Sequence, residues 1–159
     1  SAAITLPNGL VVAAIVAVNA RGDVVDPATG QVVAGMRTED GKSLADVRRR
    51  LKSGELELPL PEALQHTTIG VVATNATLTK TQATRIAQMA HDGLARAIVP
   101  AHTSADGDAI FALATGTRQG PADLDTIGAL AADAMAEAIL RAVRAATGIP
   151  GYPAARDLR

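Results

Sequence analysis

The 159-residue sequence has no cysteine and no tryptophan, and its aromatic residues are limited to Phe111 and Tyr152. Without thiols the chain can form neither a disulfide framework nor a thiolate metal site. With so few aromatic rings it cannot bind nucleic acid by stacking bases on a series of side chains. The core must therefore be built from alanine, valine, isoleucine and leucine, small side chains that let helices lie close to a sheet or to one another.

Excess charge and long apolar runs are also missing. The formal net charge is -1, which argues against a nucleic-acid surface because phosphate binding needs clustered cations. The longest apolar run, residues 10–18, is far too short to span a bilayer, and the N-terminus lacks the layout of a signal peptide. We therefore expect a cytoplasmic protein of one-domain size, with no nucleic-acid partner and no membrane partner.

Apolar periodicity divides the chain into strands and helices. The β-branched-rich run at 10–18 is typical of a strand covered on both faces, and the turn residues at 26–30 predict a hairpin over 23–33. The polar, proline-bearing residues 34–66 predict an exposed linker with one short helix near 43–52. The other expected elements are a strand over 68–74, a helix from 79 whose apolar face includes Ile98 and which ends at Pro100, a strand over 109–114, and a helix over 123–146.

These elements indicate an α/β (α+β) fold in which alanine-rich helices cover sheet faces. The strands are too few to complete such layers. We therefore expect the chain to be an incomplete share of a single domain, with a partner segment or chain supplying the remaining strands.

The segment His66-Thr67-Thr68-Ile69-Gly70 has the pattern of a masked nucleophile. A hydroxyl residue opens an apolar run after a polar approach, so cleavage between His66 and Thr67 would free the α-amine of Thr67 beside its own Oγ. An amine and a hydroxyl in one residue supply a general base and a nucleophile together. Asp106-Gly107-Asp108 follows about forty residues later and adds two carboxylates.

The sequence resembles the self-processing aminopeptidase and amidase family typified by DmpA, which includes β-peptidyl aminopeptidases and the 6-aminohexanoate-oligomer hydrolase. The matching strings are ITLPNGLVVAAIVAVNARGDVVDPATG at 4–30, the segment 66–116 and GIP at 148–150. The resemblance implies an αββα four-layer sandwich similar to the N-terminal-nucleophile hydrolases. It also implies a precursor that cuts itself, with residues 1–66 ending its α part and residues 67–159 forming its β part.

The same resemblance implies roles for individual residues. Thr67 would be the nucleophile, the His66-Thr67 bond the processing site, Asn19 a donor to the oxyanion, and Asp106 with Asp108 the acidic partners of Thr67. No cofactor and no metal are implied. The implied partners are the N-terminal α portion of the same precursor, further αβ units in a homo-oligomer, and a small peptide or amide substrate.

Each assignment has a structural alternative. A Thr-Thr pair at a strand start is commonly explained by β propensity, and Asn19 before Ala20-Arg21-Gly22 is typical of a turn. Asp-Gly-Asp often marks a loop, and the further acidic ligands of a calcium loop are missing. His66, His91 and His102 are too dispersed to predict a metal site. His91-Asp92 is expected to be a packing or capping pair, and Arg48-Arg49-Arg50 a solvated helix face.

Two further points leave the reaction open. Ser1 is a second candidate nucleophile, ranked below Thr67. The nylon-oligomer hydrolases carry Asn before the nucleophile, where this chain has His66, so processing itself needs a test. The alternative functions are an acyltransferase similar to the ornithine acetyltransferases and an unprocessed assembly subunit without catalysis.

Overall fold

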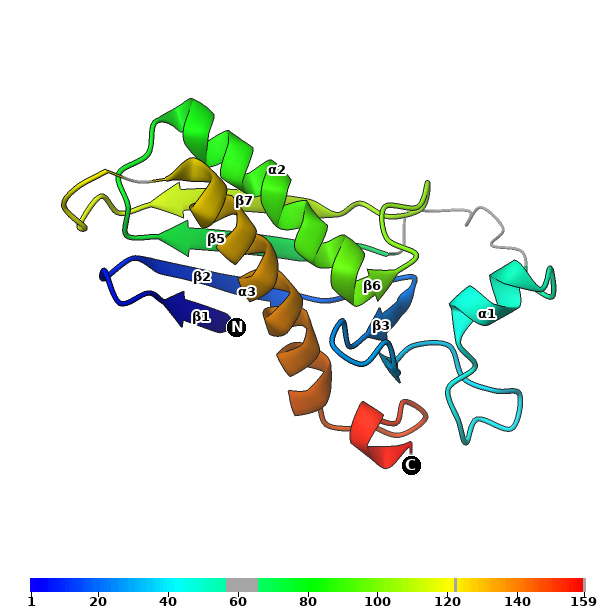
Figure 1. The fold of residues 1–159 in the computed structure, drawn as a ribbon. Helices are drawn as coiled ribbons and strands as arrows, with labels where there is room; N and C mark the ends of the chain where they lie inside the picture. The colour runs from blue at the N-terminus through cyan, green and yellow to red at the C-terminus, as the bar shows by residue number, and fades with distance from the viewer. Residues whose placement is uncertain (57–65, 122, 159) are drawn as a thin grey trace.

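Two sheets and two long helices make up the structure, a computed structural model that describes residues 1–56, 66–121 and 123–158 (Figure 1). The larger sheet has the strand order β1-β2-β5-β7. Its strands are β1 (Ala2–Thr5), β2 (Val11–Ala17), β5 (Ile69–Thr74) and β7 (Ala109–Ala114). The β1/β2 and β2/β5 pairs are antiparallel, whereas β5 and β7 are parallel. The strands expected near 10–18, 68–74 and 109–114 are thus confirmed.

Strand β1 was not among the expected elements. It pairs with β2 through a tight turn in which the Asn8 Oδ1 accepts from the Leu10 N–H at 3.0 Å and Gly9 has a φ of 79°. Asn-Gly between two apolar runs is a strong hairpin signal, because both residues tolerate the left-handed backbone of such turns. The turn signal at Asn8-Gly9 was therefore available in the sequence.

Helix α2 (Lys80–Ala97) connects the parallel strands β5 and β7. It begins with a capping box, in which the Thr79 hydroxyl accepts from the Gln82 N–H and the Gln82 side chain accepts from the Thr79 N–H. The expectation that Ile98 continues the helix is wrong. Ile98 begins the short strand β6 (Ile98–Val99), which pairs with Val24, because the chain turns into the second sheet before Pro100.

Helix α3 (Leu124–Ala145) lies beside α2, and both lie across the same face of the larger sheet (Figure 1). Small residues set their close approach. A Cβ added at Gly93 of α2 would lie 2.4 Å from the Ala132 carbonyl oxygen and 2.8 Å from the Met135 Cβ. The buried side chains between helices and sheet are aliphatic and include Val12, Val72, Leu94, Ile127 and Ile139.

The opposite face of the larger sheet is open within the described residues, so the expectation of strands covered on both faces is wrong for this chain alone. Its outward positions are apolar, and the large side chains on it are well exposed. Ile15 and Phe111 are both 62% exposed, Ile69 is 49% exposed and Leu113 is 47% exposed. Large exposed apolar patches mark interaction sites or ligand-binding grooves.

The smaller sheet has the order β4-β3-β6 and confirms the hairpin expected over 23–33. Its first two strands are β3 (Asp23–Val25) and β4 (Val32–Ala34). The turn between them is closed by hydrogen bonds from the Asp26 N–H to the Gln31 carbonyl and from the Gly30 N–H to the Asp26 carbonyl.

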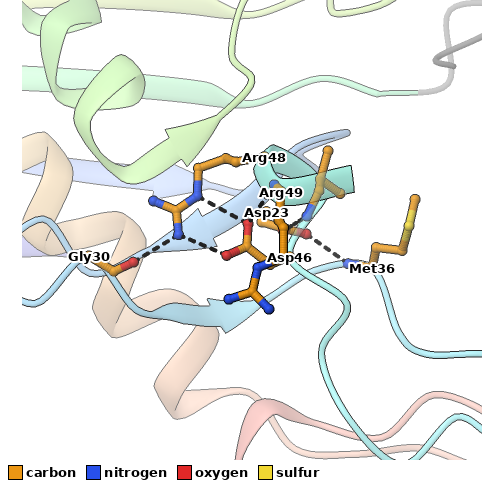
Figure 2. A network of polar contacts seen from close by, with 7 residues as sticks. Asp23, Gly30, Met36, Asp46, Arg48 and Arg49 are labelled. Atoms are coloured by element: carbon orange, nitrogen blue, oxygen red, sulfur yellow. Dashed lines mark hydrogen bonds and ion pairs between the residues drawn. The ribbon is translucent and has the colours of Figure 1, made fainter. Parts of the chain in front are cut away.

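Part of the expected linker is folded onto this sheet. Asp23 is fully buried, and its carboxylate accepts from the Met36 N–H at 2.9 Å and the Val47 N–H at 2.6 Å (Figure 2). Burial raises the pKa of Asp23 despite these two hydrogen bonds, which lower it. Val47 is the first residue of helix α1 (Val47–Lys52), which lies within the range 43–52 expected for a short helix. The predicted linker at 57–65 lies outside the described residues.

The run Arg48-Arg49-Arg50 was expected to form a solvated face of a helix, and this holds only in part. Arg48 contacts both Asp46 carboxylate oxygens, at 3.2 and 3.3 Å, and donates to the Gly30 carbonyl at 2.8 Å, so it ties α1 to the hairpin turn (Figure 2). The Asp46 side chain caps the helix by accepting from the Arg49 N–H. Among the described residues, no helix has the length and apolar character needed to cross a membrane.

Candidate active site

Thr67 lies where three strands of the larger sheet meet at one edge. The β5/β7 ladder continues beyond the amino ends of both strands: the Gly107 N–H donates to the His66 carbonyl at 3.0 Å, and the Ala109 N–H donates to the Thr68 carbonyl at 3.1 Å. This places Thr67 next to Gly107. The sequence places these segments forty residues apart, and the parallel pairing brings them together.

Asn19 reaches the same point from the other side. It follows the carboxyl end of β2, which runs antiparallel to β5, and its backbone carbonyl accepts from the Thr67 N–H at 3.0 Å. The peptide bond between His66 and Thr67 is thus held on both sides, its carbonyl by Gly107 and its N–H by Asn19. Asn19 and Gly107 therefore lie on either side of Thr67, and the contact of Asn19 described here is made by its backbone.

The Thr67 hydroxyl lies against the carbonyl that it would attack. Its Oγ1 donates to the His66 carbonyl oxygen at 2.7 Å. A Cβ added at Gly107 would lie 2.8 Å from this Oγ1, so any side chain at 107 would push the hydroxyl away. Gly107 is a functional position that the sequence reasoning missed. The signal was the glycine between the two aspartates.

The two aspartates hold the backbone around Thr67. Asp106 Oδ2 accepts from the Thr103 N–H at 2.9 Å and the Thr103 hydroxyl at 2.8 Å, which closes the turn before β7. Asp108 Oδ1 accepts from the Thr68 N–H at 2.8 Å, and its side chain is 5% exposed.

Within residues 1–56, 66–121 and 123–158, neither carboxylate bonds the Thr67 hydroxyl. Strand alternation explains this geometry. Asp106 and Asp108 pair with His66 and Thr68, whose side chains point to the other face of the sheet from that of Thr67. Their direct action on the nucleophile stays a prediction. The Asp108 carboxylate binds the N–H of Thr68, whereas the Asp106 carboxylate binds Thr103.

Two histidines lie close to Asp108, His102 in direct contact and His91 next to His102. His102 Nδ1 is 3.4 Å from Asp108 Oδ2, and the His102 ring lies against His91 of α2 with the ring centroids 5.0 Å apart. Burial, followed by the charge of His102, lowers the pKa of His91. The histidines are thus less dispersed in space than in the sequence. Among the described residues, however, no group of three or more His, Asp or Glu side chains could hold a metal ion.

Two buried polar atoms next to the candidate nucleophile have no hydrogen-bond partner in the described part of the chain. They are His66 Nδ1 and the Oγ1 of Thr68, a fully buried residue. Buried polar atoms without a hydrogen-bond partner are uncommon in native structures. They flank Thr67 on either side in the sequence.

Ser1, the second candidate nucleophile, lies away from this edge. It precedes β1, whose Ala2 pairs with Ala14 of β2. In that register Ser1 lies opposite Ile15, which pairs with Val71 of β5. Val71 lies about 13 Å from Thr67 along the strand, at about 3.3 Å per residue. The Asn19 carbonyl and the Asp108 carboxylate therefore contact Thr67 and Thr68, away from Ser1.

Comparison with known proteins gives a consistent result. The sequence profile of peptidase family S58 matches residues 1–156. An uncharacterized aminopeptidase of Mycobacterium leprae is 43% identical over 168 residues, covering 96% of this chain and 46% of the relative. A 6-aminohexanoate-oligomer endohydrolase of Kocuria sp. is 28% identical over 142 residues, covering 82% of this chain and 40% of the relative. The chain spans about half the length of the curated relatives that it matches.

A solved structure shares the fold at low sequence identity. The L-aminopeptidase D-Ala-esterase/amidase of Ochrobactrum anthropi, described as a variant of the Ntn-hydrolase fold, superposes with a TM-score of 0.58 at 21% identity. The superposition covers 95% of this chain and 40% of the Ochrobactrum anthropi protein. The Ntn-hydrolase type of fold expected from the sequence is thereby confirmed.

Proposed function

The chain belongs to peptidase family S58, and we propose that it carries the nucleophile, Thr67, of a self-processing amidohydrolase. One observation supports this assignment above all. The Thr67 hydroxyl lies 2.7 Å from the carbonyl oxygen of the residue before it, while that oxygen also accepts a backbone N–H from Gly107. Nucleophile, electrophile and a donor to the developing oxyanion are therefore adjacent.

Processing begins when Thr67 Oγ attacks the His66 carbonyl carbon. The new C–O bond gives a tetrahedral intermediate whose negative oxygen remains bound to the Gly107 N–H, a donor of the kind that stabilises oxyanions. The C–N bond then breaks and the hydroxyl proton is transferred to the Thr67 nitrogen, which leaves an ester. Water hydrolyses the ester, releasing the His66 carboxylate and restoring the Thr67 hydroxyl beside a free α-amine.

The mature site would use the same hydroxyl on substrates. The α-amine of Thr67 accepts the proton as Oγ attacks the substrate amide, and the amine product leaves with that proton. Water then hydrolyses the acyl-enzyme. Asn19 is proposed as a side-chain donor to the oxyanion, and Asp106 and Asp108 as the acidic groups that orient the freed amino terminus.

We propose small peptides or short amide oligomers as substrates. The relatives that support this class are named as aminopeptidases and as 6-aminohexanoate-oligomer endohydrolases. Thr67 lies at the edge of the open face of the sheet, beside the exposed Ile69. A second sheet over that face would enclose the nucleophile in a cleft between two sheets.

The N-terminal portion of the same precursor is proposed to cover the open face, and the resulting units to assemble as a homo-oligomer. Two observations support the first part. The chain spans about half the length of its relatives, and the large exposed side chains of the face, on β2, β5 and β7, are apolar.

An amidase assay on the full-length protein tests the function. Aminoacyl amides and 6-aminohexanoate oligomers should be hydrolysed, and Thr67→Ala should abolish hydrolysis. Transfer of an acetyl group from acetylornithine to glutamate would instead indicate the acyltransferase.

A further inference from the structure

Asp108 is an almost buried carboxylate with a different partner for each oxygen. Its side chain is 5% exposed; Oδ1 accepts from the Thr68 N–H at 2.8 Å, and Oδ2 lies 3.4 Å from the Nδ1 of His102. A carboxylate removed from water needs donors on its oxygens, because desolvation of the charge is otherwise costly. Thr68 supplies one donor through its backbone. The side-chain nitrogen nearest to the other oxygen is His102 Nδ1, at ion-pair distance.

The His102 side chain is 42% exposed, but two features restrain its position. Its backbone has a φ of 55°, a left-handed conformation that non-glycine residues seldom adopt and that persists when surrounding contacts determine it. The imidazole lies between Asp108, which precedes β7, and His91 of α2, at a centroid distance of 5.0 Å and an interplanar angle of 54°. The titratable groups around the pair of rings are Asp108 on one side and Asp92 on α2.

This arrangement connects helix α2 to the nucleophile through a short series of contacts. His91 contacts His102, His102 contacts Asp108, and Asp108 holds the N–H of Thr68, the residue after Thr67. The Thr68 carbonyl also accepts a hydrogen bond from the Ala109 N–H in the ladder with β7. A rotation of the Asp108 carboxylate would therefore release the N–H of Thr68, the residue next to the nucleophile.

We propose that His102 is a positioning residue: its Nδ1 holds the Asp108 carboxylate in the orientation that binds Thr68, and so keeps Thr67 aligned for processing and for turnover. The inference rests on the proposed function of Thr67. His102 itself touches neither the scissile carbonyl nor the nucleophile.

Two isosteric variants test the proposal in the full-length protein. Asparagine and aspartate both tolerate a left-handed backbone. H102N keeps a donor near the position of Nδ1, whereas H102D places a second carboxylate against Asp108. H102D should lower both the processing rate and kcat by about 10- to 100-fold through misalignment, with KM changed less than about twofold, while H102N stays within about threefold of the wild type.

The exposed Ser104 in the same turn provides the matched control. S104D adds the same charge at an exposed position two residues from His102 and should leave processing and kcat unchanged. If H102D does not fold, H102G is the second variant, since it keeps the backbone conformation and removes the donor. It should lose the activity that H102N retains.

Equal activity of H102N and H102D, or of H102N and H102G, would overturn the proposal while leaving Thr67 as the nucleophile. A loss in H102D that S104D shares would overturn it as well. A wild-type protein that is neither processed at His66-Thr67 nor active on amides would instead refute the proposed function, and this inference with it.

Discussion

The backbone N–H of Gly107 donates to the carbonyl oxygen of His66 at 3.0 Å, so the carbonyl of the candidate processing site is held by the loop that carries both aspartates. The same glycine leaves room for the Thr67 hydroxyl. The two segments are distant in the sequence, and the parallel β5/β7 ladder brings them into register. The amino ends of two neighbouring strands thereby form the site.

Gly107→Ala should slow processing strongly. The added Cβ would lie 2.8 Å from Thr67 Oγ1 and displace the hydroxyl from the His66 carbonyl. We expect the processing rate to fall by about 100-fold, as for misplacement of a reacting group by about 1 Å. The rate is measured by following the precursor band over time.

Gly41→Ala is the control for this substitution. Gly41 has a φ of 71° and open space around it, so alanine there strains the backbone of a distant turn without touching Thr67. Processing should continue at the wild-type rate. A Gly107→Ala chain that is processed as fast as Gly41→Ala would show that the space beside the hydroxyl is unimportant.

Asp23→Ala should destabilise the smaller sheet. The substitution leaves the N–H groups of Met36 and Val47 without their acceptor in a region where Asp23 is fully buried. Each unmet buried donor costs about 1–3 kcal/mol, so the loss of both acceptor contacts should lower the free energy of unfolding by about 2–6 kcal/mol. Urea denaturation measures the change. Asp40→Ala, in an exposed turn, should change the free energy by less than about 1 kcal/mol. Equal effects of the two substitutions would contradict the assigned role of Asp23.

His91 makes stability depend on pH in the mildly acidic range. Burial and the charge of His102 lower its pKa in the folded state below the ordinary 6.5. As the pH falls, His91 therefore takes up a proton in the unfolded chain before it does so in the folded chain. The stability that neutral His91 contributes is fully present above pH 6.5 and is lost as the pH falls through the folded pKa. Melting temperatures from pH 8 to pH 5 should fall more steeply for the wild type than for His91→Gln. Parallel curves for the two proteins would contradict this assignment.

The open face of the larger sheet gives a prediction about the full-length protein. Ile15 is 62% exposed in this chain, and an exposed substitution ordinarily changes stability by less than about 0.5 kcal/mol. If the precursor's N-terminal portion covers the face, Ile15→Asp buries an unpaired charge and should lower the melting temperature of the full-length protein markedly. Thr84→Asp on the exposed surface of α2 serves as the control. Similar melting temperatures for the two variants would show that the face stays uncovered.

Much of the fold could be predicted from local patterns. The apolar run at 10–18 and the three- and four-residue spacing within 123–146 each determine one element directly, and both are confirmed. The Asn8-Gly9 hairpin was readable but overlooked. Ile98 could not be assigned locally, because its apolar side chain fits a helix face as well as a strand, and only pairing with Val24 decides.

The site was predictable in its parts but not in its contacts. Asn19, Thr67, Asp106 and Asp108 gather at one edge because of strand order, which single-sequence periodicity does not specify. Asp106 and Asp108 were expected to be the acidic partners of Thr67, and residues two apart in an extended segment share a face. That alternation is present, but the register with β5 directs them to the face of Thr68. His102 carried no sequence signal at all, because its partner His91 lies on a separate helix.

Intact-mass analysis of freshly expressed full-length protein, with Thr67→Ala alongside, tests the central assignment most directly. The wild type should yield two fragments, one ending at His66 and one beginning at Thr67 with a free α-amine, while Thr67→Ala stays a single uncut chain. Cleavage of the Thr67→Ala protein at the same bond, or hydrolysis of amides by a wild type that remains uncut, would contradict the account.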